Sequence, residues 1–159
     1  ENCEMVDGQP KCFQEAFSTC WTMGGSHYQS FDGQPFHFMG SCTYTLVKTC
    51  HSDPTGSTFN IEIQKEHKDI SKTSSIASLV IEVYDVTVAA VHSENGIVRV
   101  NHLRSHLPIS ISQGRIQLEQ NGRFLQVTTD FKLKVFYDWE DHVVVKLPKK
   151  FSGKVCGLC

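Results

Sequence analysis

Short runs of alternating apolar and polar residues dominate the chain from Ser30 onward. Phe59, Ile61 and Ile63, for example, alternate with polar residues. A two-residue period is typical of strands that bury one face and expose the other. The pattern contains no convincing amphipathic helix, so it predicts an all-β fold. The expected strands cover residues 43–48, 59–64, 78–84, 86–91, 97–100, 115–118, 124–127, 131–136 and 143–146.

Two Asn-Gly pairs separate successive apolar runs. Asn95-Gly96 lies between 86–91 and 97–100, and Asn121-Gly122 separates the next two runs. Asn-Gly favours the adjacent positive φ angles of tight hairpin turns. Strands at this spacing predict a sandwich of two antiparallel sheets. The polar stretches 51–57 and 68–75 are expected to be loops.

Composition narrows the possible partners. The 159 residues are enough for one domain with its own core. Fifteen basic and seventeen acidic residues give a formal charge of −2, which offers no electrostatic basis for binding nucleic acid. No apolar stretch approaches the ~20 residues that span a bilayer, so direct membrane insertion is not expected.

Seven cysteines indicate an oxidising compartment, and therefore a protein that is secreted or faces the outside of the cell. Cys3 and Cys12 bracket the turn signal at residues 7–10, which predicts a local disulfide between them. Residues 1–19 are accordingly expected to be the tail of a preceding small cysteine-rich module.

Motifs at both ends of the remaining sequence resemble those of the von Willebrand factor type D domain. Near the start these are Cys20-Trp21, Gly25-Ser26-His27-Tyr28, Phe31-Asp32-Gly33 and Phe38-Met39-Gly40-Ser41-Cys42-Thr43-Tyr44, and the chain closes on Cys156-Gly157-Leu158-Cys159. The resemblance implies that residues 20–159 form this domain, truncated just after its C-x-x-C motif. It also implies a disulfide-stapled sandwich, which agrees with the periodicity.

The resemblance further implies a pairing scheme for the cysteines. Cys20 is expected to bond to Cys159, and Cys50 to Cys156. Cys42 is expected to be unpaired, because its partner in the family lies downstream of the C-x-x-C motif. The alternative for Cys42 is a buried thiol that packs as a small hydrophobe.

Asp32 is the candidate metal ligand. The resemblance implies that it helps to bind calcium, together with Asn and Asp ligands that follow the C-x-x-C motif in the family. Calcium prefers six to eight oxygen ligands. Calcium is therefore expected as a cofactor of the parent protein, and only weak calcium binding is expected for residues 1–159. The alternative is that Asp32-Gly33 is an ordinary turn pair.

Catalytic motifs are not apparent, and the chain is predicted not to be an enzyme. Gly25-Ser26 stands where many relatives carry an Asp-Pro bond, at which some of them cleave themselves, and it supplies no carboxylate. Ser26 and His27 are neighbours in sequence and do not form a spatial dyad. His102 and His106 have a helical ligand spacing, but on a strand they would lie ~13 Å apart.

Aromatic residues leave two interpretations open. Trp21, Phe136, Tyr137 and Trp139 could form an exposed patch for a partner protein, since aromatic residues are enriched at binding hot spots. They could equally fill the core, which is the preferred interpretation for Phe136 and Trp139.

The predicted function is a non-catalytic structural or adhesion module of a large extracellular glycoprotein, either secreted or membrane-tethered, in matrix, mucus or cell-adhesion assembly. The expected partners are neighbouring cysteine-rich modules of the same chain and other extracellular glycoproteins. Homo-oligomerisation is expected to be weak at most. The alternative is a domain that binds a specific protein ligand, such as an antibody Fc region or an egg-coat or matrix protein.

Overall fold

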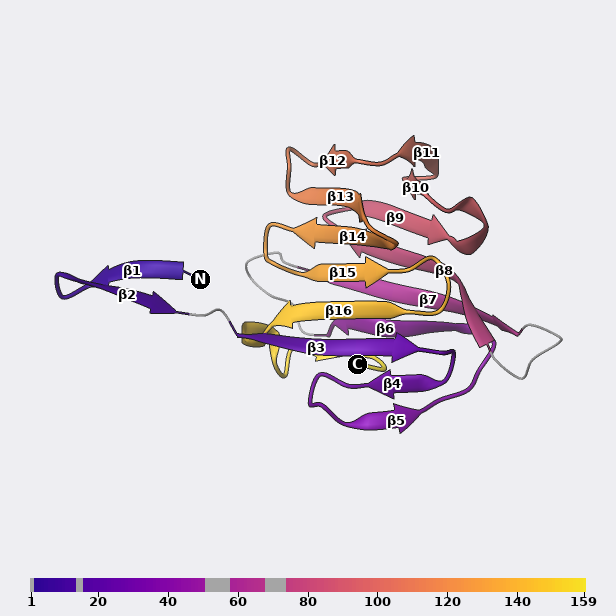
Figure 1. The fold of residues 1–159 in the computed structure, drawn as a ribbon, viewed down its shortest axis with the longest axis horizontal. Coiled ribbons are helices and arrows are strands. Elements are labelled where there is room, and N and C mark those ends of the chain that lie inside the picture. The colour runs from indigo at the N-terminus through magenta and orange to yellow at the C-terminus, as the bar shows by residue number, and fades with distance from the viewer. Residues whose placement is uncertain (1, 14–15, 51–57, 68–73) are drawn as a thin grey trace.

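A computed structural model describes residues 2–13, 16–50, 58–67 and 74–159 of the chain. Two antiparallel sheets pack face to face as a sandwich, and a two-stranded hairpin lies outside it (Figure 1). The eight-stranded sheet has the order β12-β13-β14-β15-β16-β3-β4-β5, and the seven-stranded sheet the order β11-β10-β9-β8-β7-β6-β17. The predicted all-β, two-sheet architecture is confirmed.

The hairpin consists of β1 (Asn2–Val6) and β2 (Gln9–Phe13). The eight-stranded sheet contains β3 (Phe17–Met23), β4 (His27–Gln29), β5 (Pro35–His37), β12 (Ile109–Ile111), β13 (Ile116–Asn121), β14 (Phe124–Thr129), β15 (Lys134–Tyr137) and β16 (Val143–Pro148). The seven-stranded sheet contains β6 (Thr43–Thr49), β7 (Phe59–His67), β8 (Ser74–Val83), β9 (Val86–Val91), β10 (Ile97–Val100), β11 (Leu103–His106) and β17 (Val155–Cys156). Two short 3-10 helices are η1 (His92–Glu94) and η2 (Lys149–Phe151).

The core lies between the sheets and is filled by alternate residues of each long strand. On β7, Phe59, Ile61 and Ile63 are buried, as their alternation predicts. On β14, Leu125 and Val127 meet them from the opposite sheet as members of the same apolar cluster. Burying an aliphatic or aromatic side chain of this size contributes about 1.5–3 kcal/mol, so this face dominates the stability of the domain.

Both predicted hairpins form, but their asparagines do not take positive φ angles. Asn95 has a φ of −55°, and Gly96 alone carries the positive value of 85°. Asn121 ends β13 opposite Phe124, and Gly122 takes the positive φ. Glycine has no Cβ to oppose this conformation, so it carries the left-handed position at both turns.

Two tight turns are formed by sequences that do not stand out as turn signals. Tyr84-Asp85 joins β8 to β9 with consecutive positive φ angles, and Asn101-His102 joins β10 to β11 in the same way. His102 therefore lies in a turn, whereas His106 lies on β11 opposite Ile97. The expectation that the two histidines share one strand is wrong, because His102 belongs to the turn that precedes β11.

The predicted loop at 68–75 extends too far, because its last two residues belong to a strand. β8 begins at Ser74, and Ser75 pairs with Glu66 on β7. Backbone pairing extends the ladder there irrespective of the polar side chains, and Ser75 is buried. Residues 68–73 and the expected loop at 51–57 lie outside the described part of the chain.

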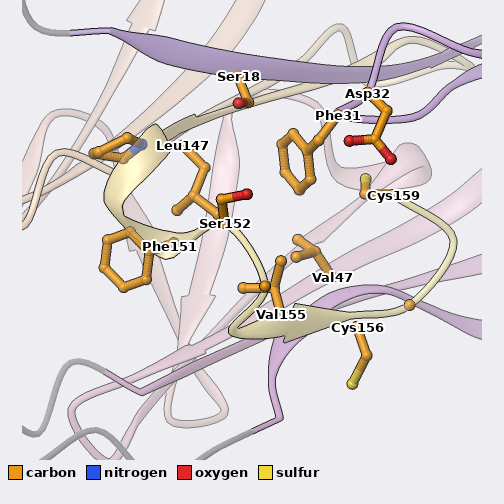
Figure 2. Close-up of a pocket in the computed structure, with 13 residues that line it drawn as sticks. Ser18, Phe31, Asp32, Val47, Leu147, Phe151, Ser152, Val155, Cys156 and Cys159 are labelled. Carbon is orange, nitrogen blue, oxygen red and sulfur yellow. The ribbon is translucent and has the colours of Figure 1, made fainter.

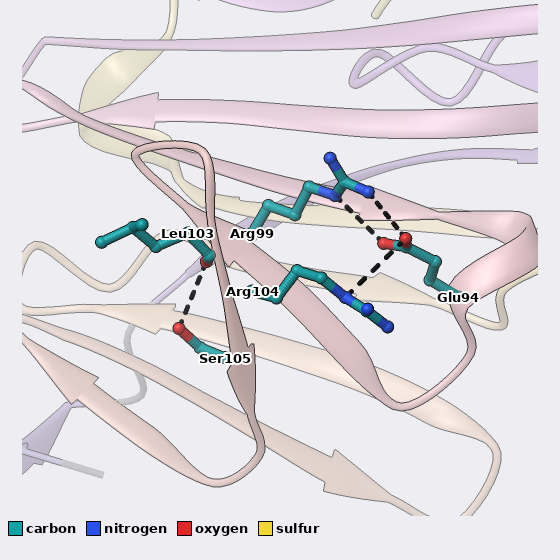
Figure 3. Close-up of polar contacts among 5 residues, drawn as sticks. All are labelled: Glu94, Arg99, Leu103, Arg104 and Ser105. Atoms are coloured by element: carbon teal, nitrogen blue, oxygen red, sulfur yellow. Dashed lines mark hydrogen bonds and ion pairs between the residues drawn. The ribbon is translucent and has the colours of Figure 1, made fainter.

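Glu94 of η1 takes part in an ion pair on the surface. Figure 3 shows the Arg99 guanidinium facing the Glu94 carboxylate, with an Nη2 to Oε1 distance of 2.7 Å. Arg104 lies near the same carboxylate, at 3.9 Å. The hydrogen bond from Arg99 lowers the pKa of Glu94. Exposed pairs of this kind add little to stability, so the core and the disulfides remain the main stabilising features.

Candidate functional site

The two ends of the sandwich meet at a seam that is closed by disulfides. Cys20 on β3 bonds to Cys159, with their Cα atoms 5.6 Å apart. Cys50, which follows β6, bonds to Cys156 on β17, with Cα atoms 5.8 Å apart. These are the pairs that the resemblance implies. The described structure also bonds Cys3 to Cys12 across the β1–β2 hairpin.

Backbone hydrogen bonds hold the last residues in the seam. The amide of Cys159 donates to the carbonyl of Leu46 at 2.9 Å, and the amide of Leu158 donates to that of Thr45 at 3.1 Å. The carbonyl of Cys159 in turn accepts a bond of 3.0 Å from the amide of Phe31. The C-x-x-C segment is therefore fixed between β6 and the loop that carries Asp32.

Gly157 allows the C-x-x-C segment to pack closely against β6. Its φ is +124°, a value that side-chain-bearing residues rarely adopt. A Cβ at this position would lie 2.6 Å from the carbonyl oxygen of Leu46 and 3.0 Å from that of Thr45. The motif thus needs glycine here for both conformation and space.

Gly157→Ala is expected to destabilise the domain by about 2–4 kcal/mol, because backbone strain adds to a clash with a strand that cannot shift freely. Chemical denaturation of the oxidised protein measures this loss. Gly153→Ala is the matched control, since Gly153 also has a positive φ but a Cβ added there would meet no atom within 4 Å. Equal losses for the two variants would contradict the close packing at Gly157.

A cavity of about 180 Å³ opens beside the seam. Figure 2 shows the Phe31 ring directed into it and the Asp32 carboxylate near Cys159. Its wall is formed by Ser18, Val47, Leu147, Phe151, Val155 and Gly157, among others. Asp32 itself is exposed. The seam therefore presents a solvent-facing carboxylate rather than an enclosed ligand pocket.

Among the described residues, Asp32 does not belong to a group of three or more convergent His, Cys, Asp or Glu side chains. The group of three acidic side chains that the structure brings within 4.8 Å of one another is Asp138, Glu140 and Asp141, at the β15–β16 turn. The Asp138 carboxylate there accepts three backbone N–H bonds of 2.9–3.1 Å, which accounts for it as a turn-forming group. Asp32 contributes one carboxylate, far short of the oxygen ligands that calcium prefers.

Lys65 is a buried lysine that no motif in the sequence marks. Its side chain is 2% exposed, and its Nζ donates to the carbonyl of Gly25 and to the hydroxyl of Tyr28. The Nζ also lies 5.2 Å from the centre of the Tyr28 ring and 5.8 Å from that of Phe38. Burial lowers the pKa of Lys65 and raises that of Tyr28. The signal was available, because the inward alternation of Phe59, Ile61 and Ile63 continues to position 65.

Cys42 is a free and exposed thiol. The alternative interpretation of a buried core thiol is therefore wrong. Cys42 precedes β6, and its carbonyl accepts a bond of 3.0 Å from the amide of Lys65. That bond fixes the backbone of the segment while the side chain remains accessible to solvent.

The aromatic residues divide between core and surface. Trp139 and Tyr137 are fully buried, and they donate hydrogen bonds to Gln120 at 3.0 Å and to the carbonyl of Ile76 at 2.8 Å. Phe136 instead points outward, because Val135 and Tyr137 take the inward positions of β15. Core packing is thus confirmed for Trp139 and wrong for Phe136.

The outward residues form a continuous row across the eight-stranded sheet. Phe136 lies opposite Val144, and Val144 lies opposite Trp21. Phe124, Phe136, Val144 and Lys146 line a shallow apolar hollow on this face. The Lys146 ammonium lies 5.8 Å from the centre of the Phe136 ring. We name Trp21, Phe124, Phe136, Val144 and Lys146 the outer-face patch.

These features define an antiparallel β-sandwich module whose two ends are joined by long-range disulfides. A family model of the von Willebrand factor type D domain matches residues 20–159, and the chain belongs to this family.

Comparison with characterised proteins finds relatives over the whole chain. The chain is 36% identical over 159 residues to the human IgGFc-binding protein, 34% identical over 159 residues to mouse alpha-tectorin and 33% identical over 160 residues to mouse zonadhesin. Each alignment covers 100% of this chain, but only 3%, 7% and 3% of the respective relatives. Trp21, residues 44–47 and Tyr137-Asp138-Trp139 indicate a likeness to these three proteins, and the comparison confirms it.

No helix in the described part of the chain has the length and apolar character needed to cross a membrane.

Proposed function

We propose that the domain is a non-catalytic structural module of a much larger extracellular protein, secreted or tethered to a membrane through other parts of that protein. The disulfides and the relatives support this proposal, since stable disulfides belong to oxidising compartments. The β1–β2 hairpin would then belong to a preceding cysteine-rich module of the same chain. Matrix, mucus or cell-adhesion assembly is the proposed setting. The proposed partners are extracellular glycoproteins and further copies of the same protein.

The observation that carries the proposal is the disulfide that joins the beginning and the end of the domain's chain. Cys20 and Cys159 are 139 residues apart in sequence but joined in space. Tension that enters at one end of the domain therefore passes through this bond to the other end. The sandwich between them is relieved of the load, which suits a module in a long chain that is pulled.

Single-molecule force spectroscopy on residues 1–159, with handles at both termini, tests this role. The oxidised protein is expected to show no release of sandwich length. Cys20→Ala with Cys159→Ala should release about 33 residues, roughly 11–12 nm, because Cys50–Cys156 still closes 106 residues. Removing both pairs should release roughly 46–50 nm. Extension of the intact sandwich would contradict the load-bypass role.

A second candidate function is specific binding of a protein ligand through the outer-face patch. Partly exposed aromatic and apolar residues beside a lysine favour a partner with an apolar anchor and neighbouring acidic groups. Since one relative is named for binding IgG Fc, human IgG Fc is the first probe by surface plasmon resonance. Binding that Phe136→Ala abolishes and Gln117→Ala preserves would support this function, and no binding would count against it for Fc.

For calcium, we propose that Asp32 supplies one ligand of a site completed by further residues in a longer protein. Residues 1–159 alone are expected to gain less than about 0.5 kcal/mol of stability in 1 mM calcium, which corresponds to a dissociation constant in the millimolar range. Thermal melts of the native sequence and Asp32→Asn, with calcium or with chelator, measure the difference. A gain above about 2 kcal/mol that Asp32→Asn removes would show that the described residues suffice.

A further inference from the structure

Three potential metal ligands lie in one row on the outer side of the eight-stranded sheet, at its β3–β4–β5 edge. Met23 on β3 is directly opposite His27 on β4, and His27 is directly opposite His37 on β5. Directly paired residues of antiparallel strands project from the same face, with Cβ atoms about 4.5–5.5 Å apart. The three side chains are therefore neighbours, although they come from three strands.

The alternate residues of the same strands show which way this row faces. Tyr28 is buried, and Phe36 stacks on it at 5.1 Å between ring centres. His27 and His37 are exposed, and Met23 is 46% exposed. The row therefore faces solvent on the side opposite the core and is accessible to an ion.

The two imidazole rings are close enough to share one ion. Their centres are 4.6 Å apart, with the ring planes at 67°. Two imidazoles that bind one metal at adjacent positions, with metal–nitrogen distances of about 2.0–2.1 Å, have ring centres roughly 4.5–5 Å apart. The observed separation of the ring centres lies within this range.

The environment of the pair leaves its nitrogens available. Within the described part of the chain, neither imidazole forms a hydrogen bond. The two rings contact each other. A Cβ added to Gly24 would lie 3.5 Å from the Cδ2 of His27, so this ring rests against the β3–β4 turn. The turn restricts the ring, which reduces the entropy lost when an ion binds.

We propose that Met23, His27 and His37 form a copper site. Imidazole suits several late first-row metals, and divalent copper binds such nitrogen ligands most tightly in the Irving–Williams order. A thioether is a soft donor that selects monovalent copper. Met23 thus extends a two-histidine site that accepts divalent copper into one that also retains monovalent copper. These nitrogen and sulfur donors differ from the oxygen donors that calcium requires.

Copper titration of oxidised residues 1–159 tests the site. All variants carry Cys42→Ser, because this exposed thiol would compete for monovalent copper. Divalent copper is added in air, and monovalent copper is added anaerobically as its acetonitrile complex with a chromophoric competitor. We expect one site per chain, with affinity for both ions at least tenfold weaker in His27→Gln and in His37→Gln. His106→Gln, on exposed β11, is the matched control and should bind as the parent does.

Met23→Leu separates the role of the thioether from that of the imidazoles. We expect at least threefold weaker binding of monovalent copper and unchanged binding of divalent copper. Unchanged binding of both ions by His27→Gln and His37→Gln would overturn the site. If both histidines matter but zinc binds more tightly than copper, or Met23→Leu has no effect on monovalent copper, the copper assignment is overturned. Identical near-ultraviolet circular dichroism of the variants excludes misfolding as the cause of any loss.

Discussion

Replacing Cys20 and Cys159 together with alanine is expected to lower the free energy of unfolding by about 4 kcal/mol. A single cross-link closing a loop of this length, 139 residues, is worth about 5 kcal/mol in the chain-entropy model. Because Cys50–Cys156 already closes the inner 106 residues, the outer bond acts on a shorter effective loop. Denaturant titration of the oxidised double variant against the native protein measures the loss.

The Cys3–Cys12 pair provides the control for this experiment. It closes only nine residues within a hairpin whose described side chains do not belong to the core cluster. Cys3→Ala with Cys12→Ala should therefore change sandwich unfolding by less than about 0.5 kcal/mol, as is usual away from the core. If both double variants lose similar stability, the outer bond does not stabilise the sandwich as we infer.

Trp139→Ala is expected to lower the free energy of unfolding by about 4 kcal/mol, within the usual range for truncating a buried tryptophan. The side chain is 1% exposed, and its ring centre lies 5.8 Å from that of Tyr137. The substitution removes this packing together with the indole hydrogen bond to Gln120. Thermal or denaturant unfolding followed by far-ultraviolet circular dichroism gives the value.

Trp21→Ala is the matched tryptophan variant, because Trp21 lies on the outer face of the same sheet. The free energy of unfolding should fall by less in this variant, about 1–2 kcal/mol, since truncating a side chain on the outer face removes fewer packing contacts. Equal losses at the two positions would show that Trp21 is as deeply packed as Trp139. That result would remove Trp21 from the outer-face patch.

The candidate sites differ in how far the sequence could predict them. Asp32 belongs to a motif that the sequence shows directly, but its surroundings depend on which loops meet at the seam. Lys65 continues a visible alternation, yet its partners Gly25 and Tyr28 lie about forty residues earlier in the chain. The pairing of His27 with His37 depends on the register of β4 and β5, which a pattern of short strands does not specify.

The sequence by itself determined the fold class, most of the strands and, through its motifs, the family. These follow from local rules, because a two-residue period, turn residues and short sequence motifs each involve residues that are close together in the chain. Tertiary structure alone decided that Cys42 is exposed, that Lys65 bonds to Gly25 and Tyr28, and that His27 lies opposite His37. Each of these outcomes depends on strand register and on contacts between segments far apart in the chain. Such contacts are selected by the packing of the whole sandwich, so no local pattern encodes them.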